Sequence, residues 1–326
     1  MISKEFDLII IGGGISGVYL LYNLSKSQPN LRILLLEKYN SFGGRVSTFH
    51  ENNKVYYEEG AGRFSNKHKL LMKLIKDLGL KENIIHIDKK LKYIEEYNKF
   101  QDHPPYQDLF KILKERSKKI DKSILQNETF EKFAINEIGK EKMKIIKDSF
   151  GYLTELIIMN AYDALNLFEE LNVSNFYVLG GGLSLLIEKM ILEIDKNKNI
   201  LMSNNNEIKD ISILKDNSFQ VKNTLGKIYS ANKVVCALPK TILEKLKIFN
   251  PIKSTLLNKV YCGSLCRIYW YYENENDNIF KDSTKFYTKN KIRIVIPISN
   301  NSIMISYTDN KYAKGVISSS RSRSKT

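Results

Sequence analysis

Cysteine and histidine are scarce in this chain, and their scarcity excludes several kinds of site. Three cysteines and four histidines in 326 residues are too few for a disulfide framework or a multi-ligand zinc site. Cys262 and Cys266 form a CxxxC spacing with no second pair, which favours reduced thiols. We therefore expect no metal, and a protein of a reducing, cytoplasmic setting.

The chain also lacks a long hydrophobic run. Its most apolar N-terminal stretch, residues 8–22, follows Glu5 and Asp7 and is interrupted by four glycines. A membrane span needs about 20 apolar residues, and a signal peptide ends in a small-residue cleavage site that is missing here. We predict a soluble protein without a membrane span.

Acidic residues are outnumbered by basic ones. Lys and Arg total 51 against 36 Asp and Glu, giving a formal net charge of +15. Such a surplus attracts nucleic acid, anionic lipid or acidic partners. No long like-charge block occurs, and no helix-turn-helix, RRM or zinc signature is present. We interpret the charge as diffuse and predict no specific nucleic-acid partner; the oligomeric state stays open.

The start of the chain has the pattern of an α/β fold. Residues 6–11 (FDLIII) and 31–37 (LRILLLE) are apolar runs typical of strands buried on both faces. Between them, a glycine-rich turn precedes a segment with apolar residues at helical spacing. Strand, helix and strand in this order predict a right-handed βαβ unit with a parallel sheet.

The glycine turn carries a dinucleotide fingerprint. In Gly12-x-Gly14-x-x-Gly17, the first glycine permits the tight turn, the second lets the backbone approach a pyrophosphate, and the third lets the helix pack on the strand. The helix N-terminus then presents free N–H groups to phosphates. Glu37 follows Gly17 by 20 residues, the spacing of the acid that binds the ribose. The fingerprint predicts dinucleotide binding without separating NAD from FAD.

Two downstream motifs favour FAD. The runs IIIGGGISG, LLLEKYNSFGGRVST and YYEEGAGRFS resemble the FAD-binding start of the flavin-containing amine oxidase family, which includes monoamine, polyamine and L-amino-acid oxidases. VLGGGLSLLIEKM, KVVCALP and YCGSLCRIYWYY are similar to later segments of that family. The resemblance implies FAD as cofactor and a small-molecule amine as substrate. The cofactor-binding residues it implies are Gly12, Gly14, Ile15, Ser16, Gly17, Glu37, Lys38, Gly43, Gly44, Arg45, Gly60, Ala61, Gly62, Arg63 and Ile208.

The resemblance implies a Rossmann-type FAD-binding domain interrupted by a second domain. We assign residues 1–65 and 177–242 to a discontinuous FAD-binding domain. A mostly helical block, with a helix capped by Ser65, and an antiparallel sheet would form the substrate domain from residues 66–176 and 243–312. The Ser- and Arg-rich stretch 313–326 is typical of a disordered tail.

Two departures from the family leave two functions open. Where the family has a lysine that assists the reaction of reduced flavin with oxygen, the segment GSLCR places Arg267, which cannot deprotonate; we take Arg267 as the candidate catalytic residue. The family's C-terminal flavin-binding stretch (AGE…EGA…SG) has no counterpart here. The first hypothesis is therefore an FAD-dependent oxidase that converts an amine to an imine. The alternative is a truncated, inactive FAD-binding relic or an interaction protein.

Overall fold

The computed structural model describes residues 5–51, 54–87, 92–96, 99–173 and 175–314. The chain divides into two compact units. Unit 1 comprises Met1–Phe64, His68–Ile85 and Tyr177–Cys262, and unit 2 comprises Ser65–Lys67, His86–Phe176 and Gly263–Thr326. The contacts thus group 68–85 and 243–262 with the N-terminal unit, whereas we had assigned both to the substrate domain; the functional boundaries stay a prediction.

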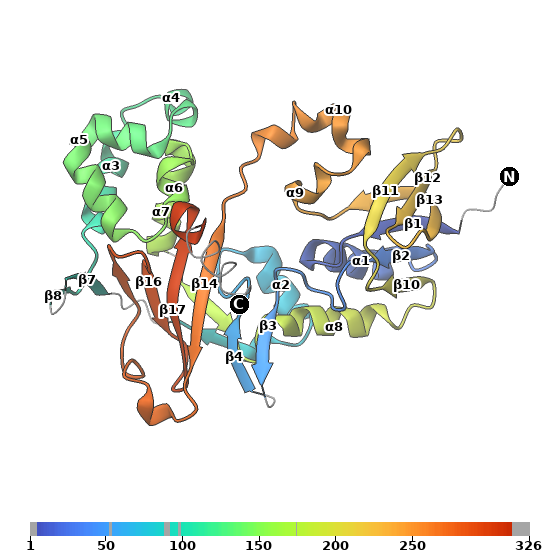
Figure 1. The fold of residues 1–326 in the computed structure, drawn as a ribbon, viewed down its shortest axis with the longest axis horizontal. Coiled ribbons are helices and arrows are strands. Elements are labelled where there is room, and N and C mark those ends of the chain that lie inside the picture. The colour runs from blue at the N-terminus through green and yellow to red at the C-terminus, as the bar shows by residue number, and fades with distance from the viewer. Residues whose placement is uncertain (1–4, 52–53, 88–91, 97–98, 174, 315–326) are drawn as a thin grey trace, which may run out of the picture. The chain divides into compact units, whose positions relative to one another are not determined.

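Unit 1 is built on a six-stranded sheet of order β10-β2-β1-β13-β12-β11 (Figure 1). The first four strands of this order are parallel, and the last three form an antiparallel meander. Its elements are β1 (Phe6–Ile11), α1 (Ile15–Ser27), β2 (Ile33–Leu36), β3 (Thr48–Glu51), β4 (Lys54–Glu58), α2 (Lys69–Asp77), α8 (Ser184–Ile194), β10 (Ile200–Ser203), β11 (Ile208–Ile213), β12 (Phe219–Asn223), β13 (Ile228–Cys236), α9 (Lys240–Leu243) and α10 (Asn250–Lys253).

The central strand β1 is apolar at nearly every position because both faces of the sheet are covered. Leu8 and Ile10 pack with α1 and α8 on one face, while Ile9 and Ile11 pack with the meander on the other. Both Ile9 and Ile10 have an exposed fraction of 0%. The predicted βαβ unit and parallel sheet are therefore confirmed.

Unit 2 combines a helical bundle with a second six-stranded sheet of order β14-β17-β16-β15-β7-β8. Aromatic side chains fill its core, among them Phe110 and Phe168, whose rings stack 4.1 Å apart. Its elements are β7 (Lys92–Glu96), β8 (Lys99–Gln101), α3 (Tyr106–Ser117), α4 (Lys122–Asn127), α5 (Phe130–Ser149), α6 (Thr154–Ile157), α7 (Ala161–Val173), β14 (Leu265–Tyr271), β15 (Phe286–Thr288), β16 (Ile294–Pro297) and β17 (Ser302–Asp309).

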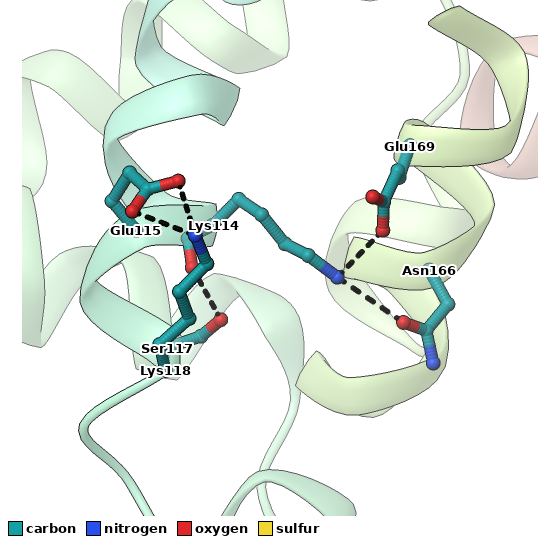
Figure 2. Close-up of polar contacts among 6 residues, drawn as sticks. All are labelled: Lys114, Glu115, Ser117, Lys118, Asn166 and Glu169. Carbon is teal, nitrogen blue, oxygen red and sulfur yellow. Dashed lines mark hydrogen bonds and ion pairs between the residues drawn. The ribbon is translucent and has the colours of Figure 1, made fainter. Parts of the chain in front are cut away.

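Polar contacts on the bundle surface join α3 to α7, as Figure 2 shows. The Lys114 Nζ lies 2.8 Å from an Oε atom of Glu169 and donates to the Asn166 Oδ1 at 3.3 Å. This lysine holds the pKa of Glu169 below its usual value. Because both side chains are partly exposed, the pair contributes little to stability, and the aromatic core beneath it holds the two helices together.

Two local expectations need correction. Ser65 is not a helix cap: it is buried in β5 (Phe64–Ser65), a strand of the sheet β5-β9-β6 formed with β6 (Ile84–His86) and β9 (Phe176–Leu179), and α2 begins after His68. Residues 313–314, which we placed in the tail, continue a helical turn in which Ala313 is buried; the rest of the predicted tail, 315–326, lies outside the described residues.

Candidate functional site

A cavity of about 770 Å³ opens in unit 1 at the carboxyl ends of the parallel strands. Ligands of doubly wound sheets bind at this edge. The predicted site residues that line it come from the turn after β1, the end of β2, the following loop and the start of β11. They are Gly12, Gly14, Ile15, Ser16, Glu37, Lys38, Gly44, Arg45 and Ile208.

Two fingerprint glycines are required by packing within the protein. Gly12 has φ of +106°, and a Cβ there would lie 2.5 Å from the Ala237 carbonyl oxygen. A Cβ on Gly17 would lie 1.9 Å from the Gly12 carbonyl oxygen. These contacts show that α1 can approach the end of β1 only with glycine at both positions. Gly17 itself does not line the cavity.

Gly14 has no such packing requirement. Its φ of −69° and ψ of 177° are open to any residue, and a Cβ there would meet only the Gly43 carbonyl oxygen at 3.8 Å. Because Gly14 lines the cavity, its missing side chain leaves space that a ligand can fill. As the N-cap residue of α1 it makes no side-chain cap bond, so the first-turn N–H groups stay available to an anion.

Glu37 fastens the end of β2 to the glycine turn. One carboxylate oxygen accepts a hydrogen bond from the Gly13 N–H at 2.7 Å, and the other accepts from the Tyr39 N–H at 2.9 Å. The side chain is buried, with 7% exposed. Each carboxylate oxygen keeps a second lone pair for a ribose hydroxyl, so the position suits the role that the fingerprint predicts.

The cationic groups of the cavity differ in their surroundings. The Arg45 side chain is exposed and forms no hydrogen bond or ion pair with any residue that the structure describes. Lys38 pairs with Glu207 at 2.8 Å, and this carboxylate raises the lysine's pKa. Arg45 is therefore a cation of this cavity that is available to a phosphate, whereas Lys38 already has a carboxylate partner.

These residues fit the ADP half of FAD. Gly14 leaves room for close approach of a pyrophosphate, the α1 N-terminus and Arg45 supply donors for its oxygens, and Glu37 lies where the ribose acid is expected. The cavity residues of unit 1 thus match the ADP half of FAD in charge, in hydrogen-bond donors and in the space that they leave. The assignment of each residue to an atom of the cofactor stays a prediction.

A further glycine motif, residues 60–62, lies close to Arg45 but has a different role in packing. A Cβ on Gly60 would lie 1.9 Å from the Arg45 carbonyl oxygen, which also accepts from the Ala61 N–H at 2.8 Å. Gly60, Ala61, Gly62 and Arg63 do not line the cavity, nor does Gly43. The structure thus explains Gly60 by backbone packing around Arg45.

Arg267 belongs to unit 2, on β14. It donates to the Tyr307 hydroxyl at 3.0 Å, and its guanidinium lies 4.5 Å from the centre of that ring. Burial lowers the pKa of Arg267, but the contacts with Tyr307 and Tyr269 outweigh burial and raise it above its usual value. The guanidinium therefore stays charged.

Sequence reasoning missed several cavity residues. Asn206 is buried, and its side-chain amide donates to the Tyr229 hydroxyl at 2.7 Å. Its backbone N–H donates to the Glu37 carbonyl oxygen at 2.7 Å. Cys236 lines the cavity at the end of β13, and burial raises its pKa to about 11. The run KVVCALP contains Cys236 and could have indicated it, whereas no local sequence pattern indicated Asn206.

The chain matches one protein family over most of its length. Residues 15–313 match the family described as "Flavin containing amine oxidoreductase". Among curated relatives, an uncharacterized protein, R188, of Acanthamoeba polyphaga mimivirus is 42% identical over 60 residues, 18% of this chain and 12% of that protein. The flavin-containing amine oxidase A of Equus caballus is 30% identical over 91 residues, 28% of this chain and 17% of that protein. The matches thus span far less than two thirds of these relatives.

Solved structures share the fold over nearly the whole chain. A variant of putrescine oxidase superposes with a TM-score of 0.74 and 14% identity, covering 96% of this chain and 77% of that one. A protein titled as a putative protoporphyrinogen oxidase of Exiguobacterium has a TM-score of 0.67 and 17% identity, covering 95% and 78%. The predicted α/β fold class is confirmed. Among the described residues, no helix is long and apolar enough to cross a membrane.

Proposed function

Because the chain belongs to the family of flavin-containing amine oxidoreductases, as its motifs predicted, we propose that it oxidises an amine-bearing substrate. FAD is the cofactor that this membership implies. The proposed reaction converts the amine to an imine, with oxygen as electron acceptor. The bound flavin would supply the redox chemistry, and the protein would supply binding, orientation and charge.

The geometry of Gly14 is the observation that most directly supports the cofactor-binding part of this proposal. Its backbone and its neighbours would tolerate a side chain, yet the residue lines a cavity at the carboxyl edge of the sheet. No contact within the protein requires glycine at this position. A ligand that lies against the backbone, and so leaves no space for a Cβ, would explain it. In this proposal Arg45 and the α1 N-terminus bind the pyrophosphate, and Glu37 binds the adenosine ribose.

The experiment begins with the purified chain of residues 1–326 reconstituted with FAD. We expect saturable FAD binding by fluorescence quenching, with NADPH binding far more weakly. Anaerobic addition of amines, with putrescine and tyramine as first probes, should bleach the flavin absorbance, and admitting oxygen should restore it with release of peroxide. Tighter binding of NADPH than of FAD would contradict the cofactor assignment. FAD binding without bleaching by any amine would favour the second candidate.

That second candidate is a non-catalytic FAD-binding protein, and the surroundings of Arg267 favour it. The guanidinium is bound to Tyr307 within the sheet of unit 2, so a structural role would explain it without any reaction. If Arg267 is a catalytic group, its fixed charge should make the re-oxidation of reduced flavin by oxygen slow, and Arg267→Lys should speed that reaction. Stopped-flow mixing of photoreduced protein with oxygen separates the two. Equal rates for the wild type, Arg267→Lys and Arg267→Met would leave only the structural role.

A further inference from the structure

A basic and apolar stretch on unit 1 has no role in the proposed reaction. Residues 245–261, here called the basic segment, contain four lysines and no aspartate or glutamate. The segment follows α9, includes α10 and is drawn in orange in Figure 1. It begins just after Thr241 and Ile242, which line the cavity.

The basic segment is anchored at a few positions and exposed elsewhere. Leu246 and Leu257 are buried, with 4% and 6% exposed, and Ile248 and Phe249 pack against the core beneath the meander. The Lys240 Nζ, outside the segment, donates to the Val260 carbonyl oxygen at 2.6 Å. The segment therefore has a defined inner side that holds it on unit 1.

Part of its outer side is apolar. Ile252, Leu256 and Val260 follow one another at intervals of four residues, and the Leu256 N–H donates to the Ile252 carbonyl oxygen at 2.9 Å. Ile252 and Leu256 therefore lie on one face of a helical turn, and Val260 follows the 3₁₀ turn Leu257–Lys259 in extended backbone. These three residues are 38%, 57% and 48% exposed, and the adjacent Tyr261 is 50% exposed. Four exposed apolar side chains so close together in the sequence favour an interaction surface here.

The charges of the same segment indicate the partner. Lys245, Lys247, Lys253 and Lys259 are exposed, and none of them forms an ion pair with a residue that the structure describes. Unpaired lysines beside exposed aliphatic side chains suit a surface that is anionic outside and apolar beneath. A nucleic acid would use the lysines but offers little to aliphatic side chains, whereas an anionic bilayer uses both.

We propose that the basic segment docks unit 1 on the surface of an anionic lipid bilayer. The four lysines contact lipid phosphates, and Ile252, Leu256 and Val260 insert at the boundary between headgroups and acyl chains. Binding is peripheral and depends on salt, because the attraction of exposed charges is screened by ions.

The test is flotation of the full chain with vesicles of phosphatidylcholine, with and without phosphatidylglycerol. We expect binding to the anionic vesicles, at least about tenfold weaker partitioning to neutral ones, and release by high salt. Changing Lys245, Lys247, Lys253 and Lys259 to Gln, or Ile252, Leu256 and Val260 to Ser, should each lower anionic partitioning about tenfold or more.

The matched control removes the same charge elsewhere on unit 1. Lys198, Lys209, Lys215 and Lys222 are also exposed, and changing them to Gln should leave vesicle binding nearly unchanged. Circular dichroism and FAD binding report whether each variant is folded. An equal loss in the control, unchanged binding in the serine variant, or no binding of the wild type to anionic vesicles would overturn the proposal. Equally tight binding of a single-stranded RNA, together with an unaffected serine variant, would assign the surface to nucleic acid instead.

Discussion

The Glu37 carboxylate accepts a hydrogen bond from the Gly13 N–H at 2.7 Å, joining the end of β2 to the turn that follows β1. This contact gives Glu37 two tasks, because the residue expected to bind a ribose also holds in shape the turn that is expected to bind phosphates. Substitutions at these positions should therefore affect stability and cofactor affinity to different extents, and the two effects can be separated.

For Glu37→Ala we expect a loss of both stability and FAD affinity. The change leaves two backbone donors, those of Gly13 and Tyr39, without the acceptor they now have, at a cost of about 1–3 kcal/mol each. The lost ribose contact adds a charge-assisted hydrogen bond, worth about 1.5–3 kcal/mol. Urea unfolding without cofactor measures the first effect, and titration with FAD and FMN measures the second. FMN has no adenosine ribose, so equal losses for both flavins would contradict the assignment.

Gly14→Ala and Gly17→Ala should have opposite profiles. At Gly14 a Cβ meets protein only at 3.8 Å, whereas at Gly17 it meets the Gly12 carbonyl oxygen at 1.9 Å. Gly14→Ala should therefore leave the melting temperature of the cofactor-free protein nearly unchanged and weaken FAD binding about tenfold or more. Gly17→Ala should destabilise the fold itself, by about 3 kcal/mol or more. Gly14→Ala with unchanged FAD affinity would remove Gly14 from the pyrophosphate site.

Cys236 should report cofactor occupancy by its reaction with iodoacetamide. Burial raises the pKa of this thiol to about 11, so about one thiol in a thousand is ionised near pH 8. The alkylation rate should rise about tenfold per pH unit through the alkaline range, and FAD should slow it because Cys236 lines the cavity. Peptide mass spectrometry resolves it from the exposed Cys262. Protection of Cys262 to the same extent would indicate a general change in the protein.

Glu155 should make unit 2 less stable as pH rises. Burial, and then the charge of Asp309, raise the pKa of Glu155 above its ordinary 4.5, and its Oε2 is buried without a hydrogen-bond partner among the described residues. The folded state therefore binds more protons than the unfolded state from pH 4.5 up to the raised pKa, so stability falls with pH across that window. Above the raised pKa of Glu155, the full loss of stability persists.

Glu155→Gln should remove this dependence and raise stability near pH 7, by on the order of 1 kcal/mol. Urea unfolding at pH 4.5 and pH 7.5 measures it. Glu141→Gln, an exposed change on α5, is the control and should behave as the wild type. A wild-type protein whose advantage over Glu155→Gln grows with pH would contradict the assigned direction.

The sequence by itself determined the beginning of unit 1. The buried strand β1, the glycine turn, α1 and the acid at Glu37 are encoded within 37 consecutive residues, and each follows from local sterics or from the need to bury apolar side chains on both faces of a sheet. The family resemblance carried by the same residues was confirmed by the match over 15–313. Local rules succeed here because the partners are close along the chain.

Only the tertiary structure decided the contacts between distant residues. Ser65 has the chemistry of a helix cap, yet burial in a strand overrides that preference. At another helix, α6, the first turn is held by a distant residue. The Asp309 carboxylate accepts a hydrogen bond from the Thr154 N–H at 2.7 Å, across 155 positions of sequence. The same holds for the pair of Lys38 with Glu207, whereas Arg45 stays available to a phosphate. No periodicity or motif encodes such pairs, because they exist only once the packed core has brought their strands and loops together.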